Sequence, residues 1–419
     1  MPIIWSLNLD MSHSISLLIA KSRRVVKPYI SKRENVIGLG LYMSSGKNSK
    51  ESFEFNGELI EPGSRVETVI KVGIDPLGRK LEIPCFIFHG LIDGPTVSIT
   101  SAIHGDELNG VGILHFLIHG YDNIPNNNDD FIDVTKLKGT LILIPIANPE
   151  SLLLKQRRTT DGRDLNRQFP GRENGNHSQR LAHKLFSSII PRSDYLIDIH
   201  TAPGTRTNLS HVRTNFDNEV CKNLAKAFGS NIVLHSLGSE GTIRREATDY
   251  GCPSILLETG SSNSFQIENV REGLAGVLNI LRSLKMITGE IREPNFRVLV
   301  RKSRWIRAPS GGLLHCLIDI GELVEKNQII AHITDPFGHK TDDIIAPCNG
   351  IIVSIATIPL TRTGDPLVHL VPLKKMFEHV KSIIGIDDDL ECKEELVNDD
   401  EGVQLDDMVF ESSEKTEPK

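Results

Sequence analysis

The cysteines of this chain form no recognisable framework. All six are scattered, with neither a CxxC pair nor the even spacing of a disulfide-rich module. This pattern argues against both a disulfide framework and a thiolate zinc site. Cysteine usage of this kind fits a reducing compartment, and we therefore expect a cytoplasmic protein.

Long apolar runs are also missing. No run reaches the roughly 18 residues of a membrane span. The basic residues near the short SISLLIA segment follow it, whereas those of a signal peptide precede its apolar core. Residues 11–33 contain no acidic residue, which fits a transit peptide, an unstructured extension or a later start at Met11. We expect no membrane partner and assign residues 1–55 to a partly disordered N-terminal extension.

Basic residues are rare at the C-terminal end. Residues 387–419 hold 14 acidic and 3 basic side chains, a net −11, so the −7 of the whole chain leaves +4 for residues 1–386. A segment with this much charge cannot bury a core of its own. We therefore expect residues 386–419 to form an acidic, disordered tail. Nothing in this charge balance indicates a nucleic-acid partner, and a homo-oligomer is compatible with the sequence.

What is present between these ends is an alternation of short apolar runs with helical patterns. The 419 residues, 39% of them hydrophobic, suffice for one large domain and a small one. The apolar runs lie at 96–103, 139–149, 193–201 and 253–260, and the helical patterns at 108–120, 177–191, 218–229 and 267–284. This order predicts an α/β fold with a mixed, mostly parallel sheet and helices on both faces. In such a sheet, the loops at the carboxyl ends of the strands form the functional site.

Two of these loops carry residues that can bind a metal. His104 ends the first strand and Glu107 follows three residues later across a glycine turn, while His200 ends the strand at 193–201. Two imidazoles and a carboxylate are ligands that zinc accepts, and three protein ligands leave a fourth position for water, whose pKa falls to about 7 on a catalytic zinc. Asp198 is placed to orient a ligand imidazole.

Two further loops complete the polar set. Glu258 ends the strand at 253–260 with no Lys or Arg near it in the sequence, as a general base beside that water would. Asn166 and Arg167 lie in the charged, turn-rich stretch RRTTDGRDLNRQFPG, and a forked guanidinium can grip a substrate carboxylate.

Each feature alone has an ordinary structural explanation. A HisxxGlu pair arises by chance in many chains, Glu258 could sit at the N-terminus of a helix, and DLNR could be a surface turn. All four clusters nevertheless follow an apolar strand or occupy a turn-rich loop. Chance gives little reason for that agreement, which favours one common site.

The motifs HGDE, DLNRQFPG, DIHT and LETG occur in this order and resemble the succinylglutamate desuccinylase/aspartoacylase family of the zinc carboxypeptidase-like fold. The resemblance covers about residues 65–290. It implies one zinc ion per chain, with the ligands His104, Glu107 and His200 and with Glu258 as general base. It also implies that Asn166 and Arg167 contact the carboxylate of an N-acyl amino acid.

The resemblance further implies arginines that contact the substrate. One of them polarises the scissile carbonyl, and Arg157, Arg158 and Arg163 are the candidates, of which we favour Arg158. A second contact is implied for Arg244, with Arg245 as its competitor. The expected partner is a small N-acylated molecule that bears a carboxylate.

The remainder of the chain contains an internal repeat. One copy begins APSGG at Ala308 and the other APCNG at Ala346, and two similar halves suggest a pseudo-symmetric β domain. Residues 296–375 resemble a biotinyl/lipoyl-like barrel-sandwich hybrid. Lys340, near the tip, lies in no recognisable modification motif, so we expect a structural domain that caps or narrows the site of a catalytic domain at 56–295.

The sequence thus favours a zinc-dependent hydrolase that removes an acyl group from the amide nitrogen of a small N-acyl amino acid. A metallocarboxypeptidase-like peptidase is the alternative within enzymes, although its open groove conflicts with the appended C-terminal domain. A non-catalytic binding protein that keeps the fold is the alternative outside them. The intact Glu258 favours an enzyme.

Overall fold

The computed structural model describes residues 50–120, 132–384 and 393–397. The expected disordered parts of the N-terminal extension, and most of the acidic tail, lie outside these residues. The described residues belong to one compact unit that begins at Ser49. None of the described helices is long and apolar enough to cross a membrane.

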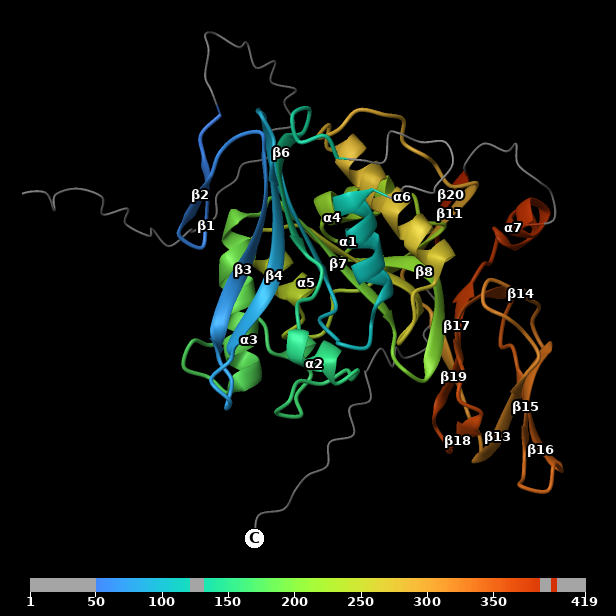
Figure 1. Ribbon diagram of the computed structural model, residues 1–419. Helices are drawn as coiled ribbons and strands as arrows, with labels where there is room; N and C mark the ends of the chain where they lie inside the picture. Colours follow the sequence, from blue (N-terminus) through green and yellow to red (C-terminus); the bar gives the residue numbers. More distant parts are fainter. Residues whose placement is uncertain (1–49, 121–131, 385–392, 398–419) are drawn as a thin grey trace, which may run out of the picture. The chain divides into compact units, whose positions relative to one another are not determined.

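A 14-stranded mixed sheet forms the frame of the molecule (Figure 1). Its main order is β12-β19-β17-β8-β10-β7-β5-β6-β4-β3, and β9, β11, β14 and β20 attach beside this path. The strands are β3 (Ser64–Ile74), β4 (Lys80–His89), β5 (Ile92–Ser101), β6 (Lys138–Ile144), β7 (Tyr195–Ala202), β8 (Arg206–Thr214), β9 (Ile232–His235), β10 (Ser254–Ser261), β11 (Phe296–Val300), β12 (Arg304–Arg307), β14 (Leu323–Val324), β17 (Gly350–Ala356), β19 (Pro366–Pro372) and β20 (Lys393–Val397).

The centre of this sheet is parallel. Strand β5 pairs in parallel with β6 and β7, and β7 pairs in parallel with β10, whereas β8 joins β10 antiparallel. The carboxyl ends of β5, β7 and β10 therefore meet at one edge, which is where the sequence places its polar loops. The predicted fold class, an α/β sheet with further β structure at the C-terminus, is confirmed.

Helices cover both faces of the sheet. They are α1 (Asn109–His119), α2 (Pro149–Leu153), α3 (His177–Ile189), α4 (Glu219–Phe228), α5 (Ile243–Tyr250), α6 (Ile267–Ser283) and α7 (Phe377–Ile384). Neighbouring residues of β7 show the two layers, since Ile197 packs in the core cluster of α1, α4 and α6, and Leu196 in that of α3 and α5. Alternation of side chains along a strand buries both faces of a central strand in this way.

Residues 296–375 continue the large sheet. Strand β17 pairs antiparallel with β8, and β11 pairs in parallel with β9, so the sheet shows no break at residue 295. A separate four-stranded sheet has the order β16-β15-β13-β18, with β13 (Gly312–Cys316), β15 (Ile329–Thr334), β16 (Lys340–Ile345) and β18 (Leu360–Thr361). Side chains of both repeat copies, such as Ile333 and Ile352, share one buried cluster. Lys340 is exposed and its Nζ donates to Asp343 at 3.0 Å.

Two short stretches expected to lie outside the fold belong to it. The first, β1 (Phe53–Phe55), pairs with β2 (Glu58–Ile60) and buries Phe55, although we had assigned it to the N-terminal extension. The second is β20, which pairs in parallel with β11 inside the segment predicted to be a disordered tail. That prediction is wrong for residues 393–397, because backbone pairing with an available strand edge requires no apolar core of the segment's own.

Candidate active site

The loop after β5 turns two polar side chains toward the sheet edge. Gly105 makes this turn, because a Cβ atom there would lie 2.0 Å from the carbonyl carbon of Ser151. The amide of Gly105 donates to the Gln156 carbonyl at 3.0 Å, and α1 begins at Asn109, so the loop is fixed at both ends. His104 and Glu107 are thereby both buried and directed to the same side.

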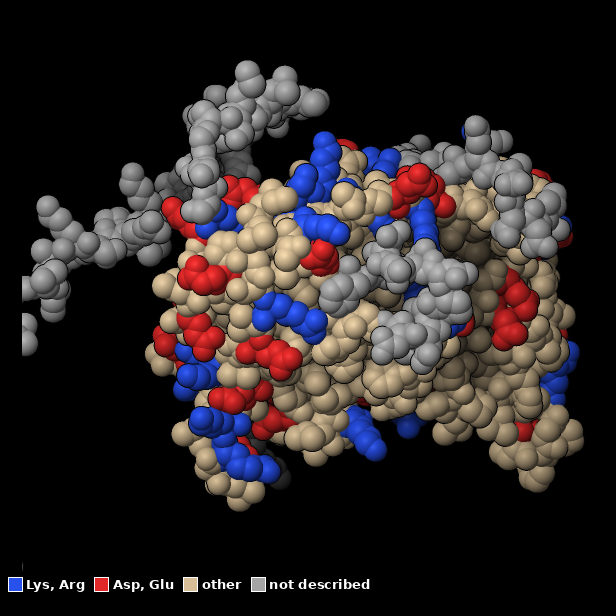
Figure 2. Space-filling view, turned by 45° about the horizontal axis from the view of Figure 1, so that its top comes forward, with Lys and Arg blue, Asp and Glu red and all other residues tan. Residues whose placement is uncertain are grey.

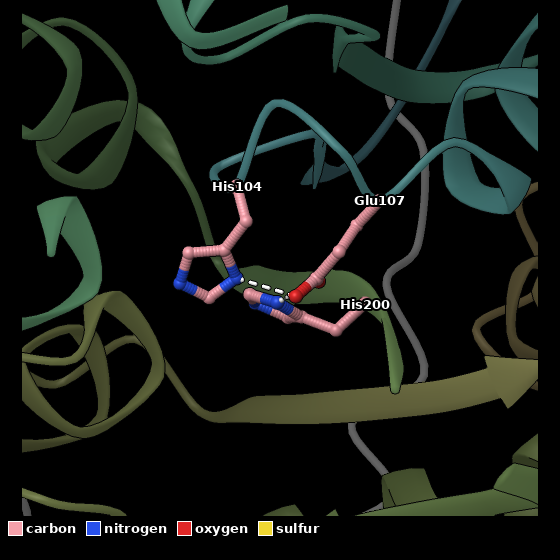
Figure 3. Close-up of side chains that lie close together, drawn as sticks. All are labelled: His104, Glu107 and His200. Carbon is pink, nitrogen blue, oxygen red and sulfur yellow. Dashed lines mark hydrogen bonds and ion pairs between the residues drawn. The ribbon is translucent and has the colours of Figure 1, made fainter. Parts of the chain in front are cut away.

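Figure 3 shows His104, Glu107 and His200 converging from β5's loop and from β7. The Nδ1 atom of His104 lies 2.8 Å from Oε1 of Glu107, and Nδ1 of His200 lies 2.8 Å from Oε2 of the same carboxylate. One ligating atom from each residue falls within 4.8 Å of the others. Within the described ranges, this is the group whose atoms could hold a metal ion.

The outer nitrogen of each imidazole faces a second carboxylate. Nε2 of His104 lies 3.0 Å from Asp164, and Nε2 of His200 lies 2.8 Å from Asp198, which also accepts from Thr100 at 2.7 Å. Donation from Nε2 to these carboxylates leaves both Nδ1 lone pairs directed at the Glu107 side, as metal-ligating histidines require. The donor set therefore fits zinc.

Electrostatics favour ionised partners within this cluster. Burial alone would raise the pKa of Glu107, but the charges of His104 and His200 hold it below its usual range. Burial would lower the pKa of His200, whereas Asp198 and Glu107 raise it well above the ordinary value. A positive charge at this position is thus strongly favoured.

Glu258 lies on β10, in register with His200 of β7. Its Oε2 accepts from Asn208 Nδ2 at 3.1 Å, and its Oε1 lies 3.9 Å from Nε of Arg213. Its side chain is only 18% exposed, and burial raises its pKa. The sequence placed no basic residue beside Glu258, whereas the fold brings Arg213 to it from β8. A carboxylate in this setting is suited to accept and return a proton.

Of the three arginines considered for the scissile carbonyl, the structure brings Arg157 to the cluster. Its Nη1 lies 3.0 Å from Glu107 and 3.1 Å from Nδ1 of His104, and its Nη2 donates to Asp164 at 3.0 Å. Arg158, which we favoured, is exposed and donates to the Gly162 carbonyl, and Arg163 pairs with Asp161. The spacing of these arginines in the sequence could not distinguish among them, whereas the directions of their side chains in the structure do.

The DLNR stretch forms a 3₁₀ turn, η1 (Leu165–Arg167). Asp164 caps it and accepts from the Asn166 amide at 2.9 Å. Asn166 is buried, with Nδ2 at 3.4 Å from Nε2 of His200 and Oδ1 accepting from the Ile243 amide at 2.9 Å. Arg167 is half-buried, and its Nη1 donates to the Asn166 carbonyl at 2.7 Å.

Arg244 and its competitor Arg245 differ in burial and in their partners. Arg244 is buried and donates to the Ser236 carbonyl at 2.9 Å, and its Nε has no hydrogen-bond partner among the described residues. Burial lowers its pKa to about 10, with the charges of Asp198 and Glu258 acting in the opposite direction. Arg245 instead lies near Glu240 and Asp249 on the outer side of α5. Of the two, Arg244 is therefore the buried arginine on which the charges of Asp198 and Glu258 act.

Replacement of Gly105 by alanine should disrupt the candidate metal site formed by His104, Glu107 and His200. The added Cβ would meet the Ser151 backbone, so the loop that carries His104 and Glu107 must shift. We expect zinc affinity to fall by at least about tenfold, as for other changes that displace ligands. Calorimetric zinc titration measures this, with Gly162→Ala as control because a Cβ there meets no atom within 4 Å, although its φ of +82° adds strain. Unchanged zinc affinity in Gly105→Ala would contradict the role of this turn.

A buried His-Glu-His group at the strand ends of an open α/β sheet, with a buried glutamate beside it, is typical of metallohydrolases. Residues 93–284 match the family model of the succinylglutamate desuccinylase/aspartoacylase catalytic domain. The resemblance predicted from the motifs is confirmed, since residues 93–284 are similar to the catalytic domain of this family.

Individual relatives support the same assignment. An N-alpha-acetyl-L-2,4-diaminobutyric acid deacetylase from Halomonas elongata is 25% identical over 255 residues, which are 58% of this chain and 71% of that protein. A succinylglutamate desuccinylase/aspartoacylase structure from Rhodobacter sphaeroides has 25% identity and a TM-score of 0.63, and the match covers 73% of this chain and 95% of that one. The product-bound ectoine utilization protein EutE (DoeB) from Ruegeria pomeroyi has 21% identity and a TM-score of 0.66, covers 77% and 99%, and thus shares the fold.

Proposed function

We propose that the protein is a zinc-dependent hydrolase that removes the acyl group from the amide nitrogen of a small N-acyl amino acid. The observation that carries this proposal is the buried His104, Glu107 and His200 cluster, with a carboxylate on the outer nitrogen of each imidazole and Glu258 beside it. The relative from Halomonas elongata is named as a deacetylase of an N-acetylated amino acid, which supports this substrate class.

The chain's own residues supply most of the chemistry. When bound, zinc contributes Lewis acidity that activates water and the scissile carbonyl. Glu258 takes the proton of the attacking water and returns it to the amine nitrogen as the carbon–nitrogen bond breaks. Asn208 donates to Oε2 of Glu258 and so holds the carboxylate in place for both transfers.

We assign the carbonyl-polarising arginine to Arg157 in place of Arg158. Its guanidinium contacts Glu107 and Asp164, and its Nη1 lies 3.1 Å from Nδ1 of His104. A cation fixed by two carboxylates next to the reacting carbonyl can stabilise negative charge as it develops on the oxygen. Asn166 lies beside His200 and Arg167 follows it in η1, and these two residues would hold the substrate carboxylate. Arg244 would support that end of the pocket.

Asn166 and Arg167, the proposed carboxylate clamp, give a direct test of the substrate class. Arg167→Ala should lower kcat/KM by roughly 10²-fold, because a charge-assisted pair is lost and the substrate carboxylate stays buried without a partner. Arg167→Lys should recover little, since an ammonium group cannot reproduce the forked geometry. The measurement is amine release from N-acetyl-L-alanine and from its methyl ester, with Arg158→Gln as the exposed control. Equal rates of wild-type protein on acid and ester would exclude the clamp.

A further inference from the structure

Arg206, at the start of β8, stands apart from the other arginines near the site. Its guanidinium carbon lies 4.8 Å from the ring centroid of Trp305, which is a cation–π contact. Within the described ranges, its side chain makes neither a hydrogen bond nor an ion pair, although the residue is only partly exposed. A half-buried guanidinium whose donors make no hydrogen bond to the described residues is suited to an anionic ligand.

The C-terminal strands hold this arginine in place. Trp305 of β12 is in register with His369 of β19, and their rings stack at 4.5 Å with an interplanar angle of 6°. His369 is 3% exposed, and its Nε2 lies 2.8 Å from the hydroxyl of Ser303. Guanidinium, indole and imidazole thus form a layered stack that limits the conformations of Arg206. Such preorganisation lowers the entropic cost of binding.

The register of β8 directs Arg206 to the same side as the general base. Against β17, Arg206 pairs with Ala356 and Asn208 with Ser354, without a bulge between them. Residues two apart in a strand share a face, and Asn208 on that face donates to Glu258. The charges of Glu258, Arg157 and Arg213 all act on Arg206, so one carboxylate and two further guanidinium groups lie within electrostatic reach of it.

We propose that Arg206 is a specificity-determining residue that binds a second carboxylate of the substrate, across Glu258 from the one at Asn166 and Arg167. Trp305 and His369 act as positioning residues for it, so that strands β12 and β19 take part in substrate recognition. This inference rests on the proposed function. The second carboxylate has two chemical sources, the acyl group or the side chain of the amino acid, and the test separates them.

Two matched pairs of substrates test the proposal with the zinc-loaded full chain. N-acetyl-L-glutamate against N-acetyl-L-glutamine examines the side chain, and N-succinyl-L-alanine against its terminal amide examines the acyl group. We expect wild-type protein to prefer the acid in one pair by about 10- to 100-fold in kcat/KM, the worth of a charge-assisted contact. Arg206→Gln should reduce this preference to below about threefold, mainly through KM.

Further variants separate recognition from folding. Arg206→Lys should restore part of the preference, and Trp305→Leu should raise KM for the acid substrate alone, because the arginine remains but loses its support. Arg65→Gln is the matched control. Arg65 lies on β3, at the opposite edge of the sheet from β12, and its guanidinium carbon lies 5.1 Å from the ring centroid of Phe88. It should leave the preference unchanged.

The outcomes distinguish this inference from the proposed function. Two outcomes overturn the role of Arg206 and leave the deacylase proposal intact. In the first, wild-type protein hydrolyses the acid and the amide of each pair equally well. In the second, a preference for the acid persists in Arg206→Gln. If zinc-loaded protein hydrolyses none of the four substrates and also releases no amine from N-acetyl-L-alanine, the deacylase proposal fails. Calorimetric binding of the same pairs then decides the inference, which requires tighter binding of an acid to wild-type protein than to Arg206→Gln.

Discussion

Glu258→Gln is expected to lower kcat by a factor of about 10²–10⁴ and to leave zinc content and substrate KM nearly unchanged. The amide keeps the shape of the carboxylate and can still accept from Asn208 through its oxygen. It cannot take a proton from water, so only the transition state loses stabilisation. Steady-state kinetics with elemental analysis of the same preparation measures both quantities.

A matched exchange controls for the loss of a glutamate in itself. Glu268 lies exposed on α6 and pairs with Arg271 at 2.9 Å, so Glu268→Gln should keep wild-type turnover. Near wild-type turnover of Glu258→Gln would show that another group carries the proton. A parallel loss of zinc would instead mean that Glu258 supports the metal cluster, which would also contradict the assignment.

The second large effect is expected from His200→Ala. This change removes one of three ligands and leaves the carboxylates of Glu107 and Asp198 buried without their shared imidazole. Zinc should fall from about one equivalent per chain to below about a tenth, and activity should fall below detection. Uncompensated buried charge also costs about 3–5 kcal/mol, so the free energy of unfolding should decrease.

His315→Ala serves as the comparison for this variant. His315 is exposed on β13 of the small sheet and contacts Thr334 at 3.1 Å, away from the cluster. It should keep zinc, activity and the thermal midpoint of the wild-type protein. Retention of a full zinc equivalent by His200→Ala would refute the ligand assignment, whatever its activity.

The features that the sequence could predict depend on residues close together in the chain. His104, His200 and Glu258 each follow an apolar run, and the three runs became β5, β7 and β10, whose carboxyl ends meet because the strands are parallel. The positions of these residues at one sheet edge therefore follow from periodicity and topology together. Figure 2 shows, for the described part of one face, basic and acidic side chains intermingled, in line with the balanced charge of residues 1–386.

The features that could not be predicted from the sequence depend on contacts between segments that are distant in the chain. Strand β8 has the polar sequence RTNLSHVRT, without a clear apolar alternation, yet it brings Asn208 and Arg213 to Glu258. Likewise, nothing in the neighbourhood of Trp305 indicates that β12 lies in the same sheet as β8. Asp164 was visible only as part of DLNR, and its contact with His104 required the coordinates of the turn.

We propose that one zinc ion at His104, Glu107 and His200 enables this chain to deacylate N-acyl amino acids. The most direct test is to titrate metal-free protein with zinc while measuring amine release from N-acetyl-L-alanine, N-acetyl-L-glutamate and N-succinyl-L-alanine. We predict activity on at least one of these substrates that rises linearly and stops rising at about one equivalent. Protein that is fully zinc-loaded by elemental analysis yet releases no amine, or metal-free protein that is already active, would contradict it.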